Sequence, residues 1–117
     1  MLILPYSKET HHMIGENQLS QMKKHSVLVN IARGGIVDDK ALINALKNQT
    51  LFAAGLDVYE GEPKLNPEFL ELENVVLSPH IGSGSVSTRR AMAMTAANNL
   101  VSVLSHNQAP LNPVNRS

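Results

Sequence analysis

Three residues whose side chains can do chemistry, Arg33, Asp57 and His80, stand at the ends of apolar runs in this 117-residue chain. Each run has the length of a buried strand. Ligands of open α/β sheets bind beyond the carboxyl ends of parallel strands, which lie at one edge of the sheet. The forked donors of an arginine suit a planar carboxylate or phosphate. Arg33 is therefore a candidate anion ligand, and the alternative is a surface arginine that caps a turn.

Because these strand ends lie at one edge of the sheet, we expect one cleft to be faced by Arg33, Asp57, Glu62 and His80. The chemistry of the group depends on this arrangement. A histidine with a carboxylate partner is a general acid–base catalyst, because the anion stabilises imidazolium and holds one tautomer. A neighbouring arginine would bind a substrate carboxylate and polarise the carbonyl beside it. The set suits a reaction at the carbon next to a carboxylate, with a proton passed to or from oxygen.

Other chemistries find less support in the sequence. No serine or lysine is placed as a covalent nucleophile, and the chain has no cysteine. No metal site is predicted, because the five histidines include no pair at helical ligand spacing. His11 and His12 are adjacent, and we expect them to point apart in a polar loop.

The positioning elements alternate between apolar strand patterns and helical patterns, which predicts an α/β fold with a parallel sheet covered on both faces. Asp38 is the predicted N-cap of the second helix, and Pro5 ends the first strand. The predicted strands are 2–4, 27–31, 51–58 and 74–77, and the predicted helices are 15–22, 38–48, 69–72 (one turn) and 87–104.

Length and composition are those of an ordinary globular protein with room for one domain. Ten basic and ten acidic residues cancel, so nothing favours nucleic acid or a membrane surface as a partner. No apolar run approaches the roughly 20 residues of a membrane span, and the N-terminus does not resemble a signal peptide. The absence of cysteine fits a reducing compartment, so we expect a cytoplasmic protein.

The stretch from Gly82 to Ser87 follows a strand and opens a helix, like the dinucleotide fingerprint G-x-G-x-x-G/A. Its third small position is a serine, and no acid stands about 20 residues further on, where the ribose partner belongs. It also comes at the end of the alternating pattern. We therefore reject it as a pyrophosphate loop.

Four segments together resemble the D-isomer-specific 2-hydroxyacid dehydrogenases, and most closely the glyoxylate/hydroxypyruvate reductase branch. The resemblance implies half of a doubly wound, Rossmann-type sheet, and a hydride transfer between NAD(P)H and a small 2-keto acid that gives the D-2-hydroxy acid. The segments are Leu4–Thr10, Asn30–Asp38, Ala54–Pro63 and Ser78–Ser83.

The resemblance also implies a role for each matching residue. Arg33 matches the ligand of the substrate carboxylate, His80 the acid–base that protonates the keto oxygen, and Glu62 the partner of that histidine. Asp57 matches a residue near the nicotinamide carboxamide. The alternatives are a plain strand-end acid for Asp57 and a solvated loop charge for Glu62. The remaining matches, all to residues that line the cofactor cleft or contact the nicotinamide, are Pro5, Ile31, Ala32 and Gly82.

Departures from the family limit these expectations. Its cofactor domain opens with a G-x-G-x-x-G loop and a selector residue, neither of which is present, so NAD and NADP are not distinguished. Residues 1–106 are expected to be the second half of that domain, truncated at its N-terminal side, and residues 107–117 a tail returning toward a substrate domain. We expect the isolated chain to be inactive, since nothing in it would hold the pyrophosphate.

The missing half would leave the strand at 2–4 as a sheet edge, which favours a homo-oligomer or a strand-paired dimer. Two further hypotheses for the function of the chain are consistent with the sequence. One is a corepressor-like binding protein built on the same fold, and the other is a truncated, inactive remnant of the family.

Overall fold

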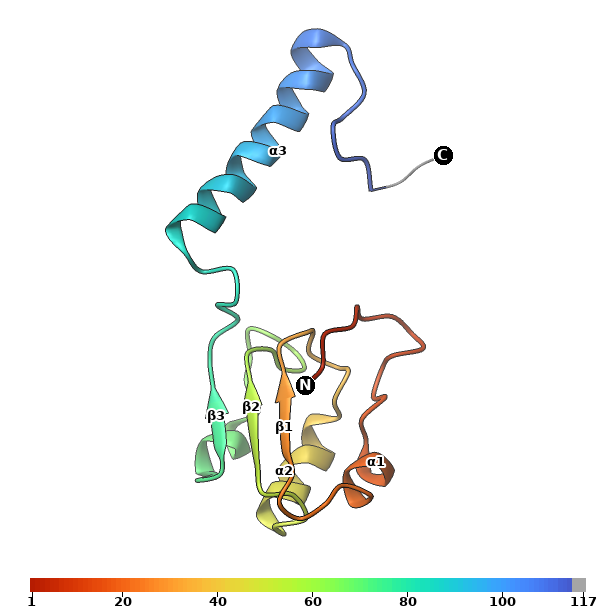
Figure 1. Ribbon diagram of the computed structural model, residues 1–117, viewed down its shortest axis with the longest axis vertical. Coiled ribbons are helices and arrows are strands. Elements are labelled where there is room, and N and C mark those ends of the chain that lie inside the picture. Colours follow the sequence, from red (N-terminus) through yellow and green to blue (C-terminus); the bar gives the residue numbers. More distant parts are fainter. Residues whose placement is uncertain (115–117) are drawn as a thin grey trace. The chain divides into compact units, whose positions relative to one another are not determined.

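The computed structural model describes residues 1–114, which form two compact units, Met1–Gly82 and a second one that begins at Ser83. Each unit is described by itself. The first contains a parallel sheet with its helices, and the second contains one long helix and the segment that follows it (Figure 1).

Three parallel strands form the sheet in the order β1–β2–β3: β1 (Val27–Asn30), β2 (Ala53–Leu56) and β3 (Val75–Leu77). Leu28 pairs with Ala54, which pairs with Val75, so one row of side chains crosses the whole sheet. The predicted α/β class and the parallel sheet are confirmed. The strands are shorter than the apolar runs, because the ends of each run continue into turns.

The helix α2 (Asp39–Lys47) connects β1 to β2, and the side chain of Asp38 caps it by accepting a hydrogen bond from the backbone N–H of Ala41 at 3.1 Å. The short helix α1 (Glu16–Ser20) precedes β1, and the 3₁₀ turn η1 (Pro67–Glu71) precedes β3. Each of these elements lies within two residues of its predicted bounds, and the predicted cap is confirmed.

The core lies between the sheet and these helices. Leu42, Ile43 and Leu46 repeat at helical spacing on α2 and are almost wholly buried. They pack in one cluster with Leu28, Leu56 and other apolar side chains of the strands. Burial of an apolar face of this kind is the main force that holds a short helix on a sheet.

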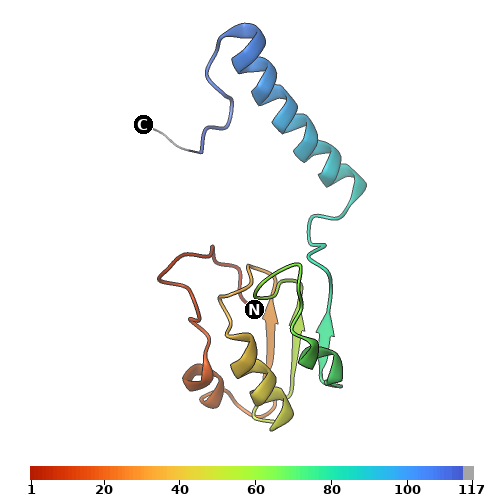
Figure 2. The same cartoon turned by 180° about the vertical axis from the view of Figure 1, so that it is seen from behind.

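Within residues 1–82, the helices cover one face of the sheet (Figures 1 and 2). Both views show α1, α2 and η1 on the same face of the sheet (Figures 1 and 2). On the opposite face, side chains are exposed or half-buried, among them Val27, Val29 and Val76. The burial of β1 and β2 alternates residue by residue, although Asn30 is the one polar residue in these two strands.

The predicted strand at 2–4 is also wrong in its extent. Only Leu2 pairs with the sheet, through a single parallel bridge to Asn30 in which its N–H donates to the carbonyl oxygen of Val29 at 2.8 Å. Pro5 cannot donate to a ladder, and Ile3 is exposed. The segment therefore touches the sheet edge without extending it.

The second unit contains α3 (Val86–His106), whose N-cap is Ser85. The segment after the helix folds back on it. The backbone N–H of Gln108 donates to the carbonyl oxygen of Ser102 at 3.0 Å. The end of the predicted tail, residues 115–117, lies outside the described residues. No helix within residues 1–114 is long and apolar enough to cross a membrane.

Candidate active site

A cavity of about 900 Å³ lies in the first unit, where the loops after β1 and β2 and the residue His80 after β3 come together. The carboxyl edge of a parallel sheet is the expected place for a ligand. Residues from four segments line this cavity: Ile3–Tyr6, Ile31–Gly35, Tyr59–Glu62 and His80.

Arg33 reaches the cavity because the chain turns sharply at the end of β1. The buried side chain of Asn30 makes this turn. It accepts a hydrogen bond from the N–H of Ala32 and donates one to the carbonyl oxygen of Arg33, both at 3.1 Å. One guanidinium nitrogen of Arg33 donates to the carbonyl oxygen of Ala32 at 2.6 Å. Among residues 1–114 no carboxylate forms an ion pair with Arg33, so its other donors are available to an anion.

His80 and Glu62 form the closest charged contact of the site, with 2.6 Å between Nδ1 and Oε2. The second oxygen of Glu62 accepts from the backbone N–H of Tyr59 at 2.9 Å. Burial alone would raise the pKa of Glu62, but the hydrogen bonds from His80 and Tyr59 outweigh it and hold this pKa below its usual value. Glu62 is therefore a carboxylate at neutral pH, and it holds the imidazole with Nε2 as the remaining nitrogen.

The backbone of His80 adopts φ +52°, in the left-handed region that side chains seldom enter. Asp57 explains how this conformation is kept. Its carboxylate accepts hydrogen bonds from the hydroxyl of Ser78 at 2.5 Å and from the backbone N–H groups of Ile81 and Gly82, both at 2.9 Å. These donors, with Ser78 first, lower the pKa of Asp57. Asp57 thus clamps the chain on both sides of His80.

The structure brings six of the eight predicted site residues to the cavity wall and leaves two outside it. Asp57 is buried and is not among the lining residues, contrary to the expectation that it faces the cleft with the others. Gly82 also lies outside the lining, where a Cβ atom would stand 3.2 Å from the carboxylate of Asp57. The six at the wall are Pro5, Ile31, Ala32, Arg33, Glu62 and His80.

Residues 1–82 match the family described as D-isomer specific 2-hydroxyacid dehydrogenase, NAD binding domain. The chain belongs to this family. The glyoxylate reductase of Pyrococcus horikoshii is 47% identical over 116 residues, which are 99% of this chain and 34% of that protein. The glyoxylate/hydroxypyruvate reductase B of Erwinia tasmaniensis is 52% identical over 102 residues, which cover 86% and 32% of the two chains.

Solved structures of the family agree with this fold. The NADPH-dependent glyoxylate/hydroxypyruvate reductase of Sinorhizobium meliloti, in complex with NADP and malonate, matches with a TM-score of 0.89 at 39% identity. The match covers 98% of this chain and 38% of that one. The chain thus spans about a third of the length of the curated relatives that it matches.

Two positioning residues of this 2-hydroxyacid dehydrogenase chain escape sequence reasoning. Asn30 makes the turn that presents Arg33. Tyr59 bonds through its hydroxyl to the carbonyl oxygens of Leu56 and Ser78, so it joins the ends of β2 and β3. The signal for Asn30 is a lone polar residue within an apolar run. A half-buried phenol that bridges two strand ends has no comparable signal in the sequence.

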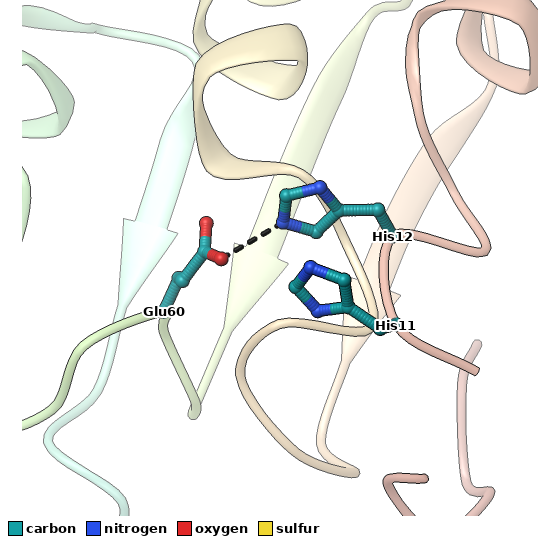
Figure 3. A group of neighbouring side chains, drawn as sticks. All are labelled: His11, His12 and Glu60. Atoms are coloured by element: carbon teal, nitrogen blue, oxygen red, sulfur yellow. Dashed lines mark hydrogen bonds and ion pairs between the residues drawn. The ribbon is translucent and has the colours of Figure 1, made fainter. Parts of the chain in front are cut away.

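The prediction that His11 and His12 point apart is wrong. Their rings stack with centroids 3.9 Å apart and an angle of 23° between planes, and His12 contacts Glu60 (Figure 3). Neighbouring side chains diverge in a strand, but this loop turns at His12, whose φ is +49°. The turn brings both rings to the same side.

Proposed function

We propose that this chain carries the reacting side chains of an NAD(P)-dependent reductase that converts a small 2-keto acid, of the glyoxylate or hydroxypyruvate type, to the D-2-hydroxy acid. The observation that supports it best is the pair of His80 and Glu62 on the wall of a cavity that also presents Arg33. The names of the relatives from Pyrococcus horikoshii and Erwinia tasmaniensis support the same reaction.

Arg33 is the proposed ligand of the substrate carboxylate. A guanidinium has five N–H donors in a fixed fork, and within residues 1–114 a single hydrogen bond, to the carbonyl oxygen of Ala32, occupies that of Arg33. Binding the carboxylate at two points would orient the neighbouring keto group and place positive charge beside the oxygen on which negative charge develops.

His80 is the proposed proton donor. Its Nδ1 proton is directed at the Glu62 carboxylate, so the proton on Nε2 of the imidazolium is the one available to the keto oxygen. After the transfer the ring is neutral, with its proton kept on Nδ1 by Glu62. The same arrangement serves the reverse reaction, in which Nε2 takes the proton from the hydroxyl.

The residues around this pair fit a nicotinamide. The cavity volume, about 900 Å³, lies within the range of small-molecule sites. When bound, the reduced cofactor supplies the hydride to the keto carbon. The residues proposed for the cofactor site include two that lie outside the cavity lining, Asp57 and Gly82, and would support the wall. Those on the wall are Pro5, Ile31, Ala32, Arg33 and His80.

Two alternative hypotheses are that the chain is a non-catalytic, corepressor-like binding protein, or that it is an inactive remnant of the family. Neither alternative requires His80 to be paired with Glu62, whereas the reductase reaction does. The pair therefore favours the reductase. We also propose a cytoplasmic location, in keeping with a chain that contains no cysteine.

For the assembly we propose a homo-oligomer, or a dimer paired along the edge beside β1. The support is that Leu2 covers this edge at one residue only. The proposed domain boundary lies between residues 106 and 107, where α3 ends and Asn107 turns into the left-handed region with φ +50°. Light scattering coupled to size-exclusion chromatography tests the assembly, and a monomer at high concentration would contradict it.

The reaction is tested by oxidation of NADH and NADPH with glyoxylate and hydroxypyruvate. The chain is assayed by itself and as a replacement for the matched segment of the Pyrococcus horikoshii glyoxylate reductase. We expect the folded chimera to reduce glyoxylate and to lose that activity in Arg33→Ala and His80→Ala. A chimera that keeps its rate without His80 would refute the acid–base role, and a folded but inactive chimera would favour the two other functions.

A further inference from the structure

A second group of ionisable side chains lies beside the cavity and has no part in the proposed reaction. His11 and His12 come from the loop before α1, and Glu60 comes from the loop after β2 (Figure 3). Nε2 of His12 is 2.8 Å from Oε1 of Glu60. One ligand atom from each of the three residues lies within 4.8 Å of the other two.

The Nδ1 atoms of both histidines lie near polar groups of other residues. Nδ1 of His11 is 3.2 Å from the hydroxyl of Tyr6, and Nδ1 of His12 is 3.7 Å from a carboxylate oxygen of Asp38. Metal-bound histidines commonly give their other nitrogen to such a partner, which fixes the tautomer and the orientation of the ring. His11 has such a hydrogen-bond partner on Nδ1, and His12 has a carboxylate near its Nδ1, so Nε2 of each ring is the proposed ligand atom.

The backbone holds both loops in place before any ligand arrives. The N–H of His12 donates to the carbonyl oxygen of Gly35 at 2.8 Å, and the N–H of Ile14 donates to that of Ile36 at 3.0 Å. The N–H of Glu60 donates to the carboxylate of Asp39 at 3.1 Å. The positive φ of His12 is a further constraint of the kind that concentrates at functional positions.

The charges at this place favour a cation. Besides Glu60, the carboxylates of Asp38 and Asp39 lie next to the group, one against His12 and one against the backbone of Glu60. A divalent cation between the three ligand atoms would reduce the repulsion among these acids.

We propose that His11, His12 and Glu60 bind a divalent transition-metal ion, best matched by Zn²⁺, through two imidazole nitrogens and one carboxylate oxygen. Two histidines and a glutamate are a set of ligands that zinc uses, with water in the fourth position. Zinc bonds of 2.0–2.1 Å place tetrahedral ligand atoms about 3.3 Å apart. Small rotations of these exposed or half-buried side chains reach that spacing from the present one. Binding of the ion at Nε2 of His12 replaces the present hydrogen bond to Glu60, and any proton held on Nε2 is released.

The ion has a structural role in this arrangement. It ties the loop of His11 and His12 to the loop that continues through Gly61 to Glu62, the partner of His80. Tyr6 and Glu60 also line the cavity. The metal would thus fix one wall of the active-site cavity without touching the reacting atoms.

The test is a zinc titration by isothermal calorimetry of the untagged chain after chelator treatment, with Co²⁺ absorption as a second probe of the ligand geometry. We expect one Zn²⁺ per chain and a rise in melting temperature on binding. Tyr6→Phe should weaken binding within the roughly 10–100-fold typical of a lost outer contact. His12→Ala and Glu60→Gln each remove a ligand and should weaken it more.

His25→Ala is the matched control, because His25 lies in the turn before β1 and belongs to no ligand group among residues 1–114. It should bind zinc like the parent chain. Melting curves in chelator show whether each variant is folded. If His12→Ala does not fold, Glu60→Gln is the ligand variant that is compared with the parent chain. Absence of stoichiometric binding, or equal affinity in the parent chain and a folded ligand variant, would overturn the proposal. Neither result would affect the assignment of Arg33 and His80.

Discussion

Gly34 is the position at which one methyl group should do the most damage to this fold. A Cβ atom there would stand 2.9 Å from the backbone nitrogen of Glu60 and closer still to the carbonyl group of Tyr59. Its φ is not in the left-handed region, so any penalty comes from contact alone. Because the obstructing atoms are backbone, the chain at Tyr59 must move by more than about 1 Å.

Overpacking of this kind typically costs about 1–3 kcal/mol, and a clash with backbone belongs at the upper end. For a unit of 82 residues, each kcal/mol corresponds to roughly 4–8 °C in melting temperature. We therefore expect Gly34→Ala to lower the melting temperature by about 12 °C or more. Since Glu62 accepts from the N–H of Tyr59, the same shift should loosen the pair with His80.

Gly55→Ala is the matched control for this substitution. Gly55 lies in the middle of β2, and the nearest atom to its added Cβ is 3.9 Å away, which is ordinary contact. Alanine in a strand should stabilise by about 0.5–1 kcal/mol relative to glycine. Thermal and urea melts followed by circular dichroism compare the two variants. A Gly34→Ala protein as stable as Gly55→Ala would refute the close approach of the two loops.

Three further predictions concern stability. Asp57→Asn should destabilise at neutral pH. Because the folded pKa of Asp57 is lowered, its contribution is complete well above the ordinary value of 3.8 and is lost as pH falls through the lower folded value. The gap to the parent chain in unfolding free energy should therefore narrow below about pH 4, and a constant gap would contradict this. Phe69→Ala should cost about 3–5 kcal/mol by urea melts, since Phe69 is wholly buried. Leu70→Ala, 73% exposed, should change stability by less than about 0.5 kcal/mol, and equal losses would contradict the core assignment. Asp38→Ala should cost about 1 kcal/mol and Asp38→Asn much less, because asparagine also caps the amide of Ala41; an equally large loss in Asp38→Asn would argue against the cap.

The order of helices and strands is readable from this sequence because local signals agree with the fold. Asp38 caps α2 as its position predicts, and the apolar spacing of Leu42 and Leu46 places the buried face. The strand at 2–4 fails as a prediction because Pro5 removes a donor and only Leu2 finds a partner. An apolar run shows that a segment suits a strand, but not that a neighbouring strand is there to pair with it.

The sequence by itself determined the parallel order of the elements, the edge at which Arg33 and His80 lie, and the family to which the chain belongs. These depend on residue type and spacing along the chain. Only the tertiary structure decided that Asp57 holds the backbone on both sides of His80, and that His11, His12 and Glu60 meet. The reason is physical: contacts between residues 12 and 60, or 57 and 82, depend on where two loops pass each other. The spacing of residues along the chain does not predict how close two loops come to each other.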